Sequence, residues 1–167
     1  MEYLKLADHE SFVNEAFIEA KKSPCKKQKV GAIIVRDNKI LSRGYNVAVG
    51  NKSCEKCLRE QFDLHHGENA EMCYAVHAEQ NAILNALNQG IDISDAYMYI
   101  AAIKNNKKRI HTKPYCTMCS RIIATTKLKG VIDYMGDKLI CYTPTELNDL
   151  AFENNIVIRK EKKDIKK

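Results

Sequence analysis

A histidine, a glutamate and a pair of cysteines have residue types and spacing that suit metal chemistry. The stretch "CYAVHAEQNAIL" places His77 and Glu79 at the start of an apolar, helix-like run. Further along, "KPYCTMC" carries Cys116 and Cys119, and this spacing lets one turn present two thiolates to one ion. One histidine and two cysteines are a ligand set of catalytic zinc sites, which keep a fourth position for water. We therefore expect these three residues to bind zinc.

Glu79 follows His77 closely enough to lie near the metal without binding it. A carboxylate in that place can act as a general acid and base for the water molecule. Both motifs fall at predicted helix N-termini, where unpaired N–H groups and the helix dipole stabilise thiolates. A lone Cys-x-x-Cys is more often structural, and a lone His-x-Glu has many ordinary explanations. Together and in this order they favour a catalytic zinc site.

The elements that must position these residues alternate between helices and strands. Asp8 can cap a first helix whose apolar face includes Phe12 to Ala20 and which stops at Pro24. The remaining predictions are a hairpin of Ala32 to Val35 and Ile40 to Arg43 turning at Asp37 and Asn38, a polar loop over 47–72, helices over 78–90, 117–130 and 143–154, and strands over 95–103, 130–135 and 155–160. Gly90 closes the second helix, Gly130 the third, and Thr143, Pro144 and Glu146 form a capping box that opens the last.

This order predicts a layered α/β domain, in which a five-stranded mixed sheet has helices on both faces. The strand–helix–strand links of the second half favour parallel pairing there. We expect one domain over residues 1–167, with a basic tail over 159–167 that is frayed or disordered.

Composition limits the possible classes of protein. The chain has a net charge of +6, is 45% hydrophobic and 29% charged, and lacks an apolar run long enough for a membrane span. Its first residues do not resemble a signal peptide, so we expect a cytoplasmic protein with no membrane partner. In a reducing compartment its seven cysteines are metal or catalytic thiols rather than disulfides, with Cys141 as a core thiol. The basic segment from Lys104 to Arg109 suits an anionic substrate.

The chain resembles the cytidine and deoxycytidylate deaminase superfamily, because H-x-E followed by C-x-x-C is the signature of zinc-dependent nucleobase deaminases. It looks most like the deoxycytidylate (dCMP) deaminases, through "KKQKVGAIIVRDNKILSRGYN", "EMCYAVHAEQNAI" and "KPYCTMCSRII". The resemblance implies a three-layer α/β/α cytidine-deaminase-like fold. It also implies that Glu79 is the proton carrier, that Asn46 contacts the sugar and base, and that the backbone of Ala78 meets the base edge. The family's Pro before the first cysteine of the hook is Tyr115 here, and the segment Ile103 to Thr112 is an insertion.

Four further thiols could bind a second, structural zinc: Cys25, Cys54, Cys57 and Cys73. Cys25 and Cys54 match ligand positions in some dCMP deaminases, whereas Cys57 and Cys73 are inferred from this sequence alone. His65 or His66 could replace one thiol, and free cysteines in a flexible loop are the alternative. A metal would stabilise the 47–72 segment, which has little apolar surface of its own.

The reaction that the resemblance implies is hydrolytic deamination of dCMP to dUMP with release of ammonia. Cytidine, CMP or another nucleotide is an alternative substrate. A non-enzymatic, zinc-stabilised nucleic-acid-binding protein is the alternative from another class. Glu79 argues against that reading, because a structural zinc site needs no acid beside an open position. The expected partners are a small nucleotide and further copies of the chain as a dimer or hexamer, and nucleic acid is not expected.

Overall fold

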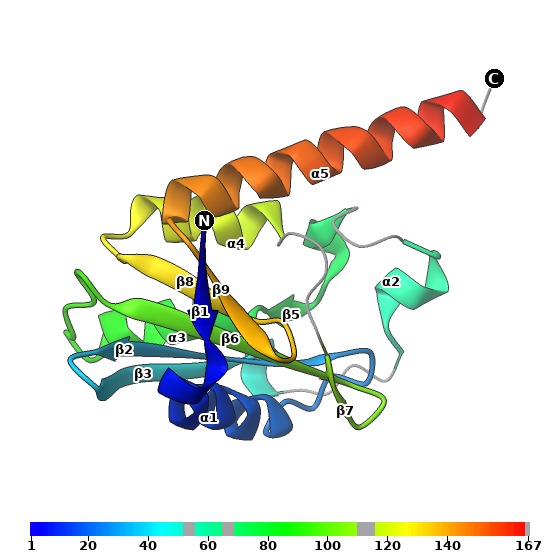
Figure 1. Cartoon of the computed structure of the whole chain (residues 1–167). Coiled ribbons are helices and arrows are strands. Elements are labelled where there is room, and N and C mark those ends of the chain that lie inside the picture. The colour runs from blue at the N-terminus through cyan, green and yellow to red at the C-terminus, as the bar shows by residue number, and fades with distance from the viewer. Residues whose placement is uncertain (52–55, 65–68, 110–115, 166–167) are drawn as a thin grey trace.

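A computed structural model describes residues 1–51, 56–64, 69–109 and 116–165 (Figure 1). The strands are β1 (Glu2–Lys5), β2 (Lys29–Arg36), β3 (Lys39–Tyr45), β4 (Val47–Ala48), β5 (Ala75–Val76), β6 (Tyr97–Lys104), β7 (Lys107–Arg109), β8 (Gly130–Tyr134) and β9 (Lys138–Tyr142). The helices are α1 (Glu10–Lys21), α2 (Leu58–Gln61), α3 (Ala78–Asn88), α4 (Thr117–Thr125) and α5 (Pro144–Ile165), with 3-10 turns at Leu6–Asp8, Val49–Asn51 and Ala70–Met72.

The main sheet of the described residues has seven strands in the order β1-β9-β8-β6-β2-β3, with β7 paired to β6. β6 and β8 run parallel, and the other pairs in this sheet are antiparallel. The prediction of a mixed sheet is therefore confirmed, although the sheet has more strands than expected. β4 and β5 pair with each other in a separate two-stranded sheet, and β5 ends directly before His77.

Side chains of β2 alternate between two hydrophobic cores, one on each face of the sheet. Ala32 and Ile34 pack with residues of α3, α4 and α5, including Ala82, Ile123 and Leu147. Their neighbours Ile33 and Val35 pack with α1 on the opposite face. Helices therefore cover both faces, as the period-two pattern of the strand requires.

Two asparagine-containing turns shape the hairpins. Asp37 and Asn38 both have positive φ, 51° and 58°, and join β2 to β3 as predicted. Asn105 and Asn106 have the same φ values and join β6 to β7 within the inserted segment. Paired positive φ angles match the right-handed twist of the flanking strands, so both turns close tight hairpins. The insertion is thus a hairpin as far as Arg109, and its residues 110–112 lie outside the described part of the chain.

The predicted strand over 155–160 is wrong, because these residues belong to α5. Figure 1 shows α5 running well beyond the sheet toward the C terminus. The place beside β8 that such a strand would need is taken by β9, which pairs with β8 from Val131↔Tyr142 to Tyr134↔Leu139. Within the described residues, none of the helices combines the length and apolar character required to cross a bilayer.

Three smaller predictions also need correction. The residue before α1 is His9 rather than Asp8, and its side chain makes no capping hydrogen bond. α4 ends at Thr125, so Gly130 begins β8 instead of closing that helix. The 47–72 segment contains β4, α2 and two 3-10 turns where a loop was expected. The capping box of α5 is confirmed: Thr143 N–H donates to Glu146 at 2.9 Å, and Glu146 N–H donates to the Thr143 hydroxyl at 3.2 Å.

Candidate active site

The start of α3 lies close to the start of α4, which brings the predicted metal ligands together. His77 and Cys116 occupy the N-cap positions of these two helices, each with extended backbone angles. Cys119 lies in the first turn of α4, and Glu79 in the first turn of α3. Ligands that are distant in sequence are therefore brought together by two helix N-termini, where the helix dipoles favour negative charge.

One ligand atom from each of His77, Cys116 and Cys119 lies within 4.8 Å of the other two. The Cys119 Sγ atom is 3.2 Å from His77 Nδ1. Cys119 is 1% exposed, whereas His77 and Cys116 are partly exposed, so the cluster is open on one side. Among the described residues, no other group of three His, Cys, Asp or Glu side chains is as close together. The predicted triad is the one that the structure assembles.

The hydrogen bonds within the cluster shift the pKa values of all three side chains. Burial lowers the pKa of His77, but hydrogen bonds with Cys116 and Cys73 and the charge of Glu79 raise it, to about 11. The hydrogen bond with Cys119 lowers the pKa of Cys116 to about 3, with His77 contributing. The same bond, together with burial, raises the pKa of Cys119. The result is a thiolate beside an imidazolium, a pair that zinc binds after displacing the protons.

The donor set fits zinc. Thiolate and imidazole are the ligands of tetrahedral zinc, and three protein ligands leave the fourth position open. Glu79 is only 6% exposed and lies close enough to Cys119 to share a hydrogen bond with it. A buried carboxylate beside an open metal position has the placement of a general acid and base.

The two residues after Glu79 fix the helix that carries it. The main-chain N–H of His77 donates to Gln80 Oε1 at 3.1 Å, which closes the first turn of α3. Asn81 Nδ2 donates to the main-chain oxygen of Tyr45 at 2.7 Å and so joins α3 to β3. Neither role was assigned from the sequence, although a Gln three residues after an N-cap is a recognisable capping pattern.

Asn46 is buried directly after β3, and its side-chain amide binds the main chain at the start of β2. Its Oδ1 accepts from Val30 N–H at 2.7 Å, and its Nδ2 donates to the Gln28 oxygen at 2.9 Å. One amide hydrogen and one lone pair remain. Ala78, the other predicted substrate contact, is fully buried at the first position of α3.

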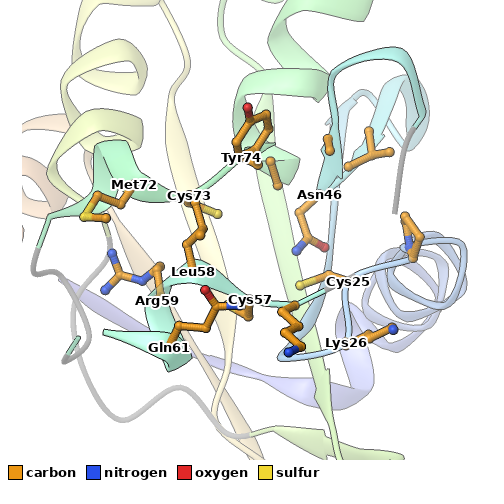
Figure 2. A pocket seen from close by; sticks show the side chains of 15 residues that line it. Cys25, Lys26, Asn46, Cys57, Leu58, Arg59, Gln61, Met72, Cys73 and Tyr74 are labelled. Atoms are coloured by element: carbon orange, nitrogen blue, oxygen red, sulfur yellow. The ribbon is translucent and has the colours of Figure 1, made fainter. Parts of the chain in front are cut away.

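A pocket of about 410 Å³ lies between the α1–β2 connection, the β4–β5 ribbon and α2 (Figure 2). Asn46 lines it, together with Cys25, Cys57 and Cys73. These three thiols therefore line one cavity, but their sulfur atoms do not all lie within 4.8 Å of one another, as the ligand atoms of His77, Cys116 and Cys119 do. Cys54, His65, His66 and Tyr115 lie outside the described residues. Cys141 is half-buried and packs against the α1 core.

An α/β sheet and two helix starts that bring a histidine, two cysteines and a buried glutamate together are the arrangement of the zinc-dependent deaminases. The family model described as "Cytidine and deoxycytidylate deaminase zinc-binding region" matches residues 6–135, and the chain belongs to this family. It is similar to a deoxycytidylate deaminase of Mycobacterium phage D29, with 32% identity over 74% of this chain and 91% of the relative. A deoxycytidylate deaminase of Schizosaccharomyces pombe is 29% identical over 81% of this chain but only 39% of the relative.

One solved structure is similar to the chain in both fold and sequence. The dCMP deaminase of cyanophage S-TIM5, determined in complex with dCMP and dUMP, superposes with a TM-score of 0.56 at 26% identity. The match covers 78% of this chain and 82% of the cyanophage chain.

Proposed function

We propose that the protein catalyses the hydrolytic deamination of dCMP to dUMP, with release of ammonia. The observation that carries this proposal is the convergence of His77, Cys116 and Cys119 within 4.8 Å, beside the buried Glu79. The names of the phage and yeast relatives, and the ligands of the cyanophage structure, support dCMP as the substrate.

His77, Cys116 and Cys119 would hold zinc, which supplies Lewis-acid activation of the attacking water when it is bound. Glu79 accepts a proton from that water and delivers it to N3 of the cytosine ring. A bond forms between the water oxygen and C4. Glu79 then carries the second proton to the amino group, the C4–N bond breaks, and ammonia leaves. Water and cytosine are thus converted to ammonia and uracil, with the carboxylate restored.

The substrate contacts follow the same proposal. The remaining amide hydrogen and lone pair of Asn46 are assigned to the sugar and base of the nucleotide. The backbone of Ala78 is assigned to the base edge, since it lies between a zinc ligand and the proton carrier in the chain. Binding in a closed pocket suits a free nucleotide better than a polymer.

A direct assay tests the proposal. The zinc-loaded protein is supplied with dCMP, CMP, deoxycytidine and cytidine, and ammonia release is measured for each. We expect dCMP to have the highest kcat/KM. A preference for CMP or a nucleoside would assign the same chemistry to another substrate. Absence of turnover on all four compounds would refute the proposed deaminase activity and favour the alternative of a zinc-stabilised nucleic-acid-binding protein.

A second, structural zinc is part of the proposal. Cys25, Cys57 and Cys73 line one pocket, and Cys54 belongs to the same Cys-x-x-Cys motif as Cys57. Two zinc ions per chain, measured by elemental analysis, would support the site. The double variant Cys54→Ser/Cys57→Ser should lose one of the two. A wild-type protein that holds one zinc, and keeps it in the double variant, would eliminate the second site.

We also propose a cytoplasmic homo-oligomer. Exposed apolar side chains on three helices support an interface between copies: Leu84 and Leu87 on α3, Ile122 on α4, and Phe152 on α5. Cytoplasmic location is supported by the thiol ligands, which a reducing compartment preserves. Light scattering at several protein concentrations and cell fractionation test the two statements separately.

A further inference from the structure

Asn46, the proposed contact of the nucleotide sugar and base, is held by a serine on the side away from the pocket. Ser23 follows α1 and is only 1% exposed, although its side chain is polar. Its hydroxyl donates to the main-chain oxygen of Asn46 at 2.6 Å and accepts from the Cys25 N–H at 3.2 Å. Asn46 and Cys25 line the pocket (Figure 2), whereas Ser23 does not. Ser23 therefore contacts the wall of the pocket and not the space that a ligand would occupy.

The chain changes from one sheet to another at Asn46. β3 ends at Tyr45 in the main sheet, and β4 begins at Val47 in the separate two-stranded sheet. Asn46 is the single residue between them, and it is buried, with 8% of its surface exposed. A buried main-chain group that leaves a sheet needs another hydrogen-bond partner. The partners of Asn46 therefore decide how this residue is oriented at the pocket.

Two acceptors of Asn46 compete for one donor on β2. Residues that face each other in a hydrogen-bonded antiparallel pair exchange both main-chain bonds. The Asn46 N–H does donate to the Val30 oxygen at 3.1 Å, but the Val30 N–H donates to the side-chain Oδ1 of Asn46 at 2.7 Å in return. The main-chain oxygen of Asn46 is thereby left to Ser23. Because a buried carbonyl without a donor is costly, the Ser23 hydroxyl is what allows the side chain to replace the main chain in this pair.

The side-chain amide of Asn46 has two fixed ends as a result. Its Oδ1 accepts from Val30, and its Nδ2 donates to the Gln28 oxygen at 2.9 Å. These two bonds set the plane of the amide, so its remaining hydrogen and lone pair have one orientation. If Oδ1 lost the Val30 N–H to the main-chain oxygen, the amide would rotate and turn these groups away from a nucleotide.

We propose that Ser23 is a positioning residue for the substrate, which fixes the orientation of the Asn46 side-chain amide by binding the Asn46 main-chain oxygen. The proposal rests on the proposed deaminase function and deepens it, because it makes substrate binding depend on a residue that the substrate does not touch.

Ser23→Ala removes one oxygen atom and tests the assignment through the kinetics of dCMP deamination. The freed main-chain oxygen of Asn46 should take the Val30 N–H from Oδ1. We expect KM for dCMP to rise roughly tenfold, since the loss of one hydrogen bond changes binding by about that factor. The value of kcat should change by less than about twofold, because Asn46 binds the nucleotide and carries no proton in the reaction. A wild-type KM in Ser23→Ala would overturn the proposal.

Thr126→Val is the matched control, because the Thr126 hydroxyl makes the same two kinds of hydrogen bond elsewhere in the chain. It donates to the Ile123 oxygen at 2.7 Å and accepts from the Leu128 N–H at 3.3 Å, just beyond the C-terminal end of α4. This variant should unfold at a lower urea concentration but keep the wild-type KM. A similar rise of KM in both variants would overturn the proposal, since general destabilisation would explain it.

Zinc content is measured in each variant beside KM. Ser23→Ala should hold as much zinc as the wild type. A lower zinc content would contradict the proposal, because the effect of the variant would then pass through the thiol of Cys25 rather than through Asn46.

Hydrogen exchange of the Asn46 side chain, followed by NMR in the protein without ligand, separates this proposal from the activity. The Nδ2 hydrogen that bonds to Gln28 should exchange slowly in the wild type and in Thr126→Val. In Ser23→Ala we expect exchange at least about tenfold faster, because the local structure that protects it opens more often. Equal exchange rates in Ser23→Ala and the wild type would refute the role of Ser23.

Calorimetric titration with dCMP completes the test where turnover is absent. If the wild type does not deaminate dCMP, the proposed function fails, yet the exchange rates and the affinities still decide what Ser23 does. Weaker binding of dCMP in Ser23→Ala, with wild-type affinity in Thr126→Val, supports the positioning role. Equal affinities of Ser23→Ala and the wild type refute it.

Discussion

Asn81 Nδ2 donates a hydrogen bond of 2.7 Å to the main-chain oxygen of Tyr45, which joins α3 to the last residue of β3, directly before Asn46. Since Glu79 and His77 lie within about one turn of Asn81, this bond ties the proposed metal ligand and the proposed proton carrier to the strand that precedes Asn46. Together with the hydrogen bond that Gln80 accepts from the His77 N–H, it holds the start of α3 in place.

Replacing Asn81 by alanine should therefore weaken both folding and catalysis. The variant leaves a partly buried carbonyl without its donor, which costs about 1–3 kcal/mol of unfolding free energy. Urea unfolding measures this loss, and kcat of the zinc-loaded variant should also fall. Asn85→Ala is the control, because Asn85 donates to the Arg43 oxygen at 2.8 Å on the exposed side of the same helix. Water can replace that donor, so equal losses in the two variants would contradict the argument.

The grouping of His77, Cys116 and Cys119 could be predicted because each of the two motifs is recognisable from a few neighbouring residues. His77 and the Cys-x-x-Cys hook each have a fixed spacing, and helix N-termini place such residues together at an edge of the sheet. The burial of Glu79 and the packing of α3 against β3 could be seen only in the folded structure. The position of α2 could not be predicted from the sequence, since the polar 47–72 segment has no pattern that places α2 beside the same pocket as the α1–β2 connection.

The prediction of a strand over 155–160 failed because tertiary structure overrides local propensity there. Ile156 and Val157 have high β propensity, but propensity is a weak guide where packing decides otherwise. The capping box starts α5 at Pro144, and β9 already occupies the edge of β8 that a further strand would use. The short strands β1 and β9 were missed because β1 is half-polar and β9 has only five residues, and both depend on pairing with strands that are distant in sequence or shown only by the fold.

Glu79→Gln should retain zinc and lose turnover. The amide has the same shape but cannot accept a proton at neutral pH, so kcat should fall about a thousandfold. Elemental analysis and the ammonia assay measure the two properties on one sample. Glu19→Gln supplies the control, because Glu19 is also a buried acid, 3% exposed, but pairs with Lys22 on α1. Substantial activity in Glu79→Gln would remove the residue from its assigned role.

Gly44→Ala should displace the catalytic helix. A methyl group there would meet Ala82 N at 2.3 Å and Ala78 O at 2.5 Å, so α3 must move away from β3. We expect a loss of about 1–3 kcal/mol in unfolding free energy and a lower kcat in the folded protein.

Gly31→Ala is the matched test of that reasoning. Its methyl group would meet Ala16 O and Ala20 N, both at 2.3 Å, which is equally tight but involves α1 on the other face of the sheet. This variant should lose stability without a comparable loss of kcat. If both variants retain wild-type kcat, the close approach of β3 and α3 does not position the site.

Zinc affinity should weaken as the pH falls. In the metal-free protein, hydrogen bonds with Cys116 and Cys73 raise the pKa of His77 to about 11 despite its burial, so zinc must displace its proton. Cys119, whose pKa is raised by its bond to Cys116 and by burial, must also lose a proton. More protons compete at lower pH, which disfavours binding. Competition with a chromogenic chelator at pH 6 and pH 8 measures the effect, and a pH-independent affinity would contradict this coupling.

The cap of α5 should contribute stability that acid removes. The hydrogen bond from the N-terminal ammonium group, with those from Thr143, lowers the pKa of Glu146 from 4.5 to about 2. Because the folded pKa lies below the unfolded one, the contribution is complete above about pH 4.5 and disappears as the pH falls through 2. Glu146→Gln should therefore be less stable than the wild type in urea at pH 7, and the difference should shrink toward pH 2. Glu153→Gln, which removes a carboxylate from a later turn of α5, serves as the control. A Glu146→Gln deficit that is the same at both pH values would show that the carboxylate charge is not what stabilises the cap.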